Sequence, residues 1–328
     1  MSNVVLITGV SRFTGSRLAG QLAADPSVDR VIGIDTAPPA AGDLQRLGRT
    51  EFVRADIRNP LVGKVIEQAQ VTTVVHASLL ASPRLAGGRV PMQELNVIGT
   101  MQLLAACQKS DSVSRVVVKS TAAIYGSGPG LPAVIAEDTQ PGRGRRTGFA
   151  KDAVEVESYV RGFARRRPDV EVTVLRLANL IGADVDSALT RYLGMPFVPT
   201  PLGYDARLQL LHDSDAVEVL RRAVAGAPTG TYNVAASGVL MLSQVIRRAR
   251  HVAIPVPAVA INAVGGLVRN TGVAEFSAEQ ARFLSHGRVL DTAALRERFG
   301  YSPRYTTAAA VDDFLAGRPA AVALPEGA

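Results

Sequence analysis

The chain has 328 residues, enough for one large α/β unit or for two lobes that share a border. Its hydrophobic content of 47% with 20% charged residues excludes a disordered chain, and its single cysteine, Cys107, excludes an intrachain disulfide. The net charge of +7 favours an anionic partner, yet no zinc-finger spacing or aromatic RNA-binding platform accompanies it, so we predict no nucleic-acid partner. The four histidines have no metal-ligand spacing, and we predict no metal site. The first apolar run, Val4–Ile7, is too short for a signal peptide, and we expect a cytoplasmic protein.

The amino-terminal half alternates short apolar runs with amphipathic helical stretches, the pattern of a parallel sheet covered on both faces. Its Val, Ile and Leu content is typical of strands buried on both sides. We therefore predict a doubly wound parallel sheet of the Rossmann type. The predicted strands are Val4–Thr8, Arg30–Ile34, Glu51–Arg54, Thr73–His76, Arg115–Lys119 and Glu171–Arg176, and the main helices between them are Met92–Gln108 and Gly148–Arg166.

The rhythm of strands and helices changes after Arg176. Residues 183–207 are rich in Pro, Gly and Tyr, which favours an inserted lobe. Leu208–Leu211 is predicted to return to the sheet, followed by a helix over Asp213–Ala225 and a strand over Gly230–Val234. We predict a Rossmann domain of residues 1–176 plus 207–236, a smaller C-terminal α/β substrate lobe of 177–206 plus 237–318, and a flexible tail of 319–328.

A glycine-rich turn, Thr8-Gly-Val-Ser-Arg-Phe-Thr-Gly15, directly follows the first strand and opens a helical stretch. Backbone N–H groups and the positive end of a helix favour a pyrophosphate there. Gly9 permits the tight turn and Gly15 allows close packing of helix on strand. Ser11, Arg12 and Phe13 complete this predicted cofactor-binding turn.

Three more strand ends carry residues suited to a dinucleotide. Asp35 ends the second strand, where a carboxylate accepts both ribose hydroxyls of an adenosine. Asp56 and Ile57 follow the third strand and are placed to meet the adenine, whereas Ala77 and Ser78 follow the fourth and would pass beneath the pyrophosphate. Because these features come in the expected order, we predict that the chain binds NAD.

The motif order resembles the extended short-chain dehydrogenases/reductases, and most closely their NAD-dependent epimerase/dehydratase branch, including bacterial proteins described as nucleotide-sugar epimerases. The resemblance covers almost the whole chain. It implies that Thr121 hydrogen-bonds the substrate oxygen, that Lys151 is the active-site lysine, and that Asn96, Ser120 and Asn179 lie near the cofactor or its lysine. The matching segments, besides the turn and Asp35, are Asn96-Val-Ile-Gly-Thr100, Lys119-Ser-Thr-Ala-Ala-Ile-Tyr-Gly126 and Leu175-Arg-Leu-Ala-Asn-Leu-Ile-Gly182.

One departure from the family pattern concerns the cofactor. Arg12 stands where this branch usually has its middle glycine, and its guanidinium could pair with a phosphate. The pair Ser11 and Arg12 also resembles the NADP-binding turn of the single-domain members. Asp35 argues against that reading, because its carboxylate would repel a 2′-phosphate. We favour NAD and keep NADP as the alternative.

The second departure concerns the proton relay. The family uses a tyrosine four residues before its lysine, whereas this chain has Thr147 there, so Thr147 is a catalytic candidate by position alone. One alternative is an oxidoreductase with another proton source, including an NADPH ketoreductase that relies on its substrate. The others are an epimerase with a displaced tyrosine, and a non-catalytic NAD(P)-binding sensor or scaffold. Proton sources considered are Tyr125, Tyr192, Tyr204, Ser78, His212 and the substrate itself.

Substrate and partners follow mainly from the resemblance, which implies a nucleotide sugar and a homodimer formed through Met92–Gln108 and Gly148–Arg166. Arg176, Arg191 and Arg207 are candidates for binding a diphosphate. The apolar stretch of residues 252–264 keeps a lipid or polyketide substrate, and contact with a membrane surface, as alternatives.

Overall fold

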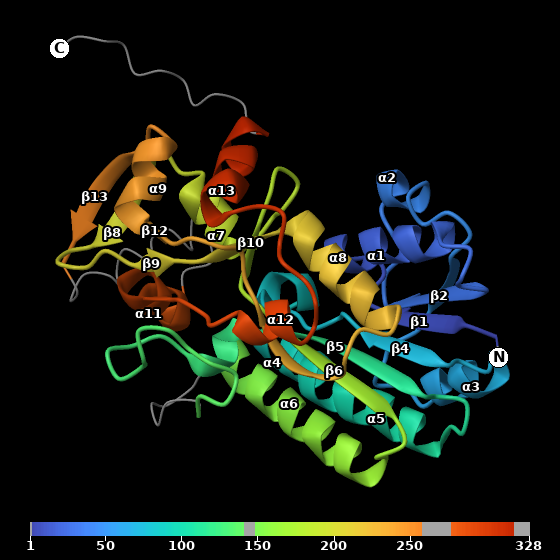
Figure 1. The fold of residues 1–328 in the computed structure, drawn as a ribbon. Coiled ribbons are helices and arrows are strands. Elements are labelled where there is room, and N and C mark those ends of the chain that lie inside the picture. The colour runs from blue at the N-terminus through green and yellow to red at the C-terminus, as the bar shows by residue number, and fades with distance from the viewer. Residues whose placement is uncertain (1, 141–147, 258–276, 318–328) are drawn as a thin grey trace.

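A parallel sheet of seven strands forms the centre of the molecule in the computed structural model, which describes residues 2–140, 148–257 and 277–317 (Figure 1). Its spatial order is β11-β6-β5-β4-β1-β2-β3, with all neighbours parallel. This order confirms the predicted doubly wound sheet. The strands are β1 (Val4–Thr8), β2 (Arg30–Asp35), β3 (Glu51–Arg54), β4 (Thr73–His76), β5 (Arg115–Thr121), β6 (Glu171–Leu177) and β11 (Gly230–Val234).

The sequence prediction of these strands was accurate at their starts and short at some ends. β5 runs to Thr121 because Ser120 and Thr121 continue the pairing with Arg176 and Leu177 of β6. Every residue of β1 and β4 is buried, as expected for central strands covered on both faces.

Helices cover both faces of the sheet (Figure 1). α1 (Phe13–Ala24) and α8 (Asp213–Val224) pack together on one face, and α3 (Leu61–Gln68), α5 (Gly99–Lys109) and α6 (Gly148–Arg166) cover the other. The short α2 (Ala41–Leu44) precedes β3. The predicted helix over Met92–Gln108 was only partly right. The structure divides it into α4 (Arg89–Gln93), a π-helical turn (Glu94–Ile98) and α5, and the turn carries the buried Asn96.

A smaller group of elements lies beyond the carboxyl ends of the strands (Figure 1). It has its own core, which includes Tyr192, Leu208, Phe283 and Phe314. The division into two domains remains a prediction, and the predicted tail lies outside the described residues. The elements are β7 (Asn179–Ile181), α7 (Ala188–Leu193), β8 (Phe197–Pro201), β9 (Arg207–Leu208), β10 (Leu210–His212), β12 (Leu240–Met241), α9 (Leu242–Arg248), β13 (Val252–Val256), α11 (Ala278–His286), β14 (Gly287–Arg288) and α13 (Thr307–Ala316). The short α12 (Ala293–Glu297) packs instead on β11 of the large sheet.

The prediction that Leu208–Leu211 returns to the large sheet was wrong. Leu208 pairs with Leu240 and Arg288, and Leu210 pairs with Asn179, in two separate small sheets. Gln209 interrupts the run because its buried side chain bonds the backbone of Ala236 and Leu290. These contacts with residues distant in the chain hold residues 208–211 between the large sheet and the smaller group of elements.

The part of the chain that the structure describes contains no helix that is both long and apolar enough to cross a membrane.

Candidate functional site

The carboxyl ends of the parallel strands meet at one edge of the sheet, beside the smaller group of elements (Figure 1). The chain winds outward from β1 through β2 to β3 and, in the other direction, from β4 through β5 to β6. β1 and β4 are therefore the neighbours at which the winding reverses. Ligands of open α/β sheets bind outside such a reversal point.

The glycine-rich turn lies at this point. Gly9 has a φ of 75° and donates its N–H to Ile34 O at 2.8 Å. A Cβ at Gly9 would collide with Ser78, and one at Gly15 would collide with the carbonyl of Gly9. The start of α1 is thus held against β1, and Arg12, its N-cap residue, makes no side-chain cap, so the amides of the first turn remain available for an anion.

Asp35 links the end of β2 to this turn. Its buried carboxylate accepts the N–H of Ser11 at 3.1 Å and that of Thr36 at 2.8 Å. The Ser11 hydroxyl donates to Ala37 O at 2.6 Å. Phe13, the first residue of α1, lies under the guanidinium of Arg17. Ser11 and Asp35, 24 residues apart, are therefore brought together as the sequence predicted, whereas Phe13 is occupied within α1.

Residues after β3 are only partly placed as predicted. Asp56 forms an ion pair with Arg58 at 2.6 Å, and this hydrogen bond lowers the pKa of Asp56. Ile57 is buried against Gly99. The Asp56 carboxylate therefore already has a cationic partner in this structure.

A buried polar network joins β1 and β4. His76 contacts Thr8 Oγ1 at 3.0 Å and Thr100 Oγ1 at 2.8 Å. Thr8 Oγ1 also accepts the N–H of Ala77 and contacts the hydroxyl of Ser78 at 3.1 Å. Burial, and then the charge of Lys119, lower the pKa of His76 to about 4, so this imidazole is neutral and positions the strand ends.

The start of α6 is fixed by ion pairing next to Lys151. Asp152, fully buried, pairs with Arg89 at 2.7 Å, and Arg89 also donates to Gly148 O. Asn96 bonds the backbone of Leu80 in both directions and lies 3.4 Å from Asp152. Lys151 itself is exposed. Asn96 thus reaches the first turn of α6 through Asp152, and Thr147 lies outside the described residues.

Thr121 and Ser120 end β5 but face different partners. Thr121 Oγ1 accepts the N–H of Ala123, which leaves its hydroxyl hydrogen available to a ligand. Ser120 donates to Glu157 of α6 at 2.6 Å. Its hydroxyl therefore belongs to the sheet–helix contact, and the structure does not bring it to the other predicted cofactor residues. Asn179, half-buried in β7, pairs with Leu210.

Arg176 is not free to bind a diphosphate, contrary to the prediction. The residue is 9% exposed, and its guanidinium binds Glu157 at 2.7 Å, Tyr125 at 2.7 Å and Glu137 O. Tyr125 in turn donates to Asn233, and burial raises its pKa to about 12. Tyr125 therefore serves this buried network and is a poor proton source. Of the other diphosphate candidates, Arg191 pairs with Asp186 at 2.6 Å, and Arg207 is half-buried in β9.

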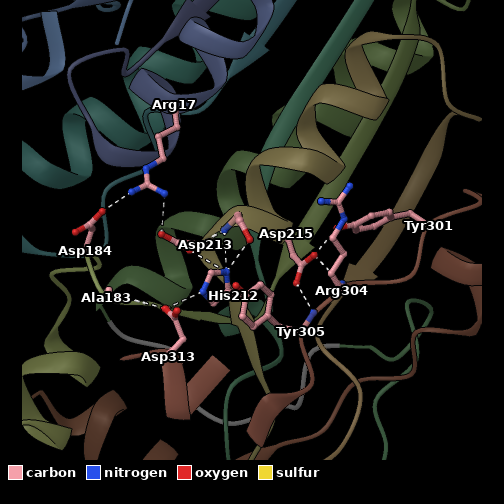
Figure 2. Close-up of polar contacts among 11 residues, drawn as sticks. Arg17, Ala183, Asp184, His212, Asp213, Asp215, Tyr301, Arg304, Tyr305 and Asp313 are labelled. Atoms are coloured by element: carbon pink, nitrogen blue, oxygen red, sulfur yellow. Dashed lines mark hydrogen bonds and ion pairs between the residues drawn. The ribbon is translucent and has the colours of Figure 1, made fainter. Parts of the chain in front are cut away.

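Three other proposed proton sources are also placed by the structure. Tyr192 is buried and donates to Pro199 O at 2.7 Å, and Tyr204 is exposed beside His286. Figure 2 shows His212 stacked on Tyr305 and in contact with Asp213 and Asp313. Burial lowers the pKa of His212, but the two carboxylates outweigh this effect and raise it overall.

The same network ties the two groups of elements together (Figure 2). Arg17 of α1 pairs with Asp184 and with Asp213 at the start of α8. Asp215 accepts the Tyr301 hydroxyl at 2.6 Å and the N–H of Arg304. His212 therefore connects α8 to α13, and this structural role explains its position.

Two functional candidates were missed in the sequence. Lys119 lies in β5, and burial followed by repulsion from Arg12 lowers its pKa to about 8. Arg288 of β14 is buried, donates to Ala122 O at 3.2 Å, and has its pKa lowered by burial to about 10. Lys119 directly follows an apolar run, whereas Arg288 lies between a glycine and Val289, and no local pattern shows that either side chain is buried.

Comparison with known proteins gives one family and several relatives. The model of the NAD dependent epimerase/dehydratase family matches residues 5–235. An uncharacterized protein of Mycobacterium tuberculosis (strain H37Rv) is 50% identical over 315 residues, which are 96% of this chain and 84% of that protein. UDP-glucose 4-epimerase of Erwinia amylovora is 26% identical over 188 residues, 55% of this chain and 54% of that protein.

Solved structures share the fold. The UDP-glucuronic acid 4-epimerase from Bacillus cereus, crystallised with UDP-glucuronic acid and NAD, has a TM-score of 0.75 at 18% identity, covering 96% of this chain and 98% of its own. The dTDP-glucose 4,6-dehydratase from Bacillus anthracis, in complex with NAD, has a TM-score of 0.73 at 16% identity, with 96% of each chain covered. At these identities the likeness concerns the fold, and it agrees with the seven-stranded sheet described above.

Proposed function

Because the chain belongs to the NAD-dependent epimerase/dehydratase family, we propose that it binds NAD at the carboxyl edge of its sheet and acts as an oxidoreductase or epimerase on a nucleotide sugar or another carbonyl or hydroxyl substrate. This membership confirms the resemblance and the enzyme class predicted from the sequence, an extended short-chain dehydrogenase/reductase. The observation that carries the cofactor proposal is the pairing of the glycine-rich turn with Asp35 at the reversal point of the sheet.

The residues at this edge fit a dinucleotide. The absence of side chains at Gly9 and Gly15 brings the turn close to β4 and β1, so a pyrophosphate could approach the backbone amides. Asp35 would hold the adenosine ribose, with Ile57 near the adenine and Ala77 and Ser78 beneath the pyrophosphate. Ser11, Arg12, Asn96, Lys151 and Asn179 complete the proposed surroundings, whereas Phe13, Asp56 and Ser120 are engaged by Arg17, Arg58 and Glu157. When bound, the nicotinamide supplies hydride transfer.

Asp35 decides the cofactor preference in this proposal. A 2′-phosphate next to its buried carboxylate would be repelled, whereas two ribose hydroxyls would be accepted. We expect NADH to bind more tightly than NADPH, and we expect Asp35→Ala to weaken NADH at least about tenfold, the loss of a charge-assisted hydrogen-bond pair. Nicotinamide fluorescence during titration of the purified protein measures both.

Asp29→Ala is the matched control, because the Asp29 carboxylate accepts hydrogen bonds only from the amino-terminal Ser2 and Asn3 among the described residues and lies away from this edge. Its NADH affinity should equal that of the unchanged protein. Preference for NADPH would instead support a ketoreductase in which Arg12 selects the cofactor. Binding of neither dinucleotide would remove the cofactor proposal altogether.

The catalytic groups proposed are Thr121 and Lys151, with Thr147 at the position of the family tyrosine. Thr121 can donate its hydroxyl hydrogen to a substrate oxygen, since its oxygen is already oriented by Ala123 N–H. Lys151 is held in the first turn of α6 by the neighbouring Asp152–Arg89 pair. A threonine hydroxyl is too weak an acid to replace a tyrosine, so the proton donor in this proposal is non-standard.

Arg288 is the best-supported residue for an anionic substrate group. Its guanidinium is buried beside Ala122, one residue after Thr121, and its charge faces Glu279 without a direct ion pair among the described residues. Arginine binds diphosphates well because its planar fork matches phosphate oxygens. This position supports a nucleotide sugar over an uncharged lipid substrate.

A non-catalytic dinucleotide sensor or scaffold is the second candidate. It is favoured by Thr147 and by the engagement of Tyr125 and Tyr192 in buried hydrogen bonds. Such a protein would bind NADH, and the fluorescence of the bound NADH would stay constant for hours in the presence of UDP-sugars and ketones because no hydride is transferred. An enzyme would change the nicotinamide absorbance or interconvert the sugars.

The proposal includes a homodimer formed through α5 and α6, which lie side by side. Met101 on α5 is 38% exposed and Ile98 just before it is 41% exposed, as apolar residues of an interface would be in a single chain. We expect Met101→Glu to convert the dimer to a monomer, since a twofold contact would bring the two charges together. Sedimentation velocity measures this change, with Leu85→Glu, an exposed residue elsewhere, as the control.

A further inference from the structure

Lys119 occupies an unusual position for a lysine. It lies near the carboxyl end of β5, with Val118 before it and Ser120 after it, and it is only partly exposed. Side chains alternate along a strand, so Lys119 and Thr121 share one face while Ser120 points to Glu157 of α6 on the other. Lys119 is therefore directed toward the face that α1 and α8 cover, below the proposed cofactor edge.

The order of the strands places β5 beside β4 and two strands from β1, and Lys119 lies on the face of β5 that leads to α1 and the glycine-rich turn. Two electrostatic effects agree with this position. Burial and then the positive charge of Arg12 lower the pKa of Lys119 to about 8. The charge of Lys119 in turn helps to lower the pKa of His76, at the end of β4. Both neighbours belong to the two strand ends at which the winding of the sheet reverses.

Neither cation has an anionic partner within residues 2–140, 148–257 and 277–317. Lys119 has no hydrogen bond or ion pair there, and Arg12 donates to the carbonyl oxygen of Leu85 at 3.3 Å. Two positive charges that lie close together in a poorly hydrated place are costly unless an anion joins them.

Other charged groups on the elements packed around β5 are already occupied. Arg17 of α1 and Asp213 of α8 pair with each other, and Asp215 of α8 accepts hydrogen bonds from Tyr301 and Arg304. Arg176 of β6 is directed to Glu157 on the opposite face. His76 is neutral because its pKa is about 4. The positive charges of Lys119 and Arg12 are therefore available to an anionic ligand.

We propose that Lys119 and Arg12 together bind the pyrophosphate of the dinucleotide. Binding of this anion would favour the protonated form of Lys119. The inference rests on the proposed cofactor site and adds a cation from β5 that the glycine-rich turn does not contain. Arg12, standing in place of a glycine, supplies a planar fork for the phosphate oxygens. A bound anion attracts both cations, and this attraction offsets the repulsion between their positive charges.

The pH dependence of NADH binding tests the proposal. A bound pyrophosphate raises the pKa of Lys119, so affinity is full below the free-protein pKa of about 8 and falls as pH rises above it. We expect Lys119→Met to weaken NADH about 10- to 100-fold below that pH and to remove the decline above it. Lys119→Arg should keep the affinity and also lack the decline, because arginine stays charged.

Arg12→Gly gives an independent signature. Removing its charge relieves the repulsion on Lys119, so the decline in NADH affinity should move to higher pH, although the affinity itself is lower. Lys109→Met, at an exposed lysine of α5, is the matched control and should leave both the affinity and its pH profile unchanged.

Two fragments of the cofactor identify the group that is bound. Calorimetry should show that Lys119→Met weakens ADP-ribose, which contains the pyrophosphate, and leaves adenosine unaffected. Proton uptake, measured in buffers of different ionisation enthalpy, should accompany ADP-ribose binding above about pH 8 in the unchanged protein only.

The inference is overturned if folded Lys119→Met binds NADH and ADP-ribose as the unchanged protein does, with the same pH profile. Failure of the unchanged protein to bind either dinucleotide at any pH would overturn the proposed cofactor together with this site. If Lys119→Met does not fold, Lys119→Arg and Arg12→Gly decide, because a pH profile identical to that of the unchanged protein in both would contradict the proposal.

Discussion

Replacing Arg176 by methionine is expected to lower the free energy of unfolding by about 3–5 kcal/mol. The guanidinium is almost fully buried and supplies hydrogen bonds to Glu157, Tyr125 and the carbonyl of Glu137. Without it, Glu157 keeps, among the residues that the structure describes, only Ser120 and a longer contact of 3.6 Å to the exposed Arg161. A buried carboxylate is then left without a close cation, which is the main source of the loss. Urea denaturation monitored by circular dichroism measures it.

Two further variants separate this cause from a general effect of removing an arginine. Arg176→Met combined with Glu157→Gln removes both charges and should be more stable than Arg176→Met alone. Arg30→Met breaks an exposed ion pair to Glu51 of similar length, 2.6 Å, and should cost at most about 1 kcal/mol. Equal losses for Arg176→Met and Arg30→Met would contradict the role given to the buried pair.

Replacing Gly15 by alanine is expected to destabilise the protein by about 3 kcal/mol and to abolish tight NADH binding. A Cβ at this position would lie far inside van der Waals contact with the carbonyl of Gly9, and backbone cannot yield as a flexible side chain can. The start of α1 would have to move away from β1, and the turn that faces the proposed pyrophosphate would move with it. Thermal unfolding and NADH fluorescence titration report the two effects separately.

Gly63→Ala is a closely matched control because Gly63, like Gly15, is the third residue of its helix. Its Cβ would meet only the methyl group of Ala106 at 3.6 Å, an ordinary contact. Alanine is the better helix former, so this variant should gain about 0.5–1 kcal/mol and bind NADH normally. If Gly15→Ala behaves like Gly63→Ala, the close approach of α1 to β1 is not required.

Short-range features of the chain were readable from the sequence. The strands of the large sheet and the helix Gly148–Arg166 follow from apolar runs bounded by turn residues, and the structure confirms them. The glycine-rich turn and Asp35 were also found, because their chemistry depends on the order of motifs along the chain. Parallel strands have their carboxyl ends at the same edge of the sheet, so the turn after β1 and Asp35 at the end of β2 lie close together.

Partners distant in the sequence were not readable. Arg176 was taken for a substrate-binding residue because nothing near it in the chain shows that Glu157 and Tyr125 enclose it. Leu208–Leu211 reads locally like a core strand, yet its partners Leu240, Arg288 and Asn179 draw it into small sheets.

By itself, then, the sequence determined the sheet, the position of the glycine-rich turn and the family, since each depends on periodicity or on motif order within short stretches. Only the tertiary structure decided which charges are satisfied and which are left over. Arg176 is paired with Glu157, whereas Lys119 and Arg12 have no carboxylate partner among the described residues. The reason is physical: the energy of a charge depends on what surrounds it in space, and those surroundings come from segments that are distant in the chain, 19 to 51 residues away for Arg176.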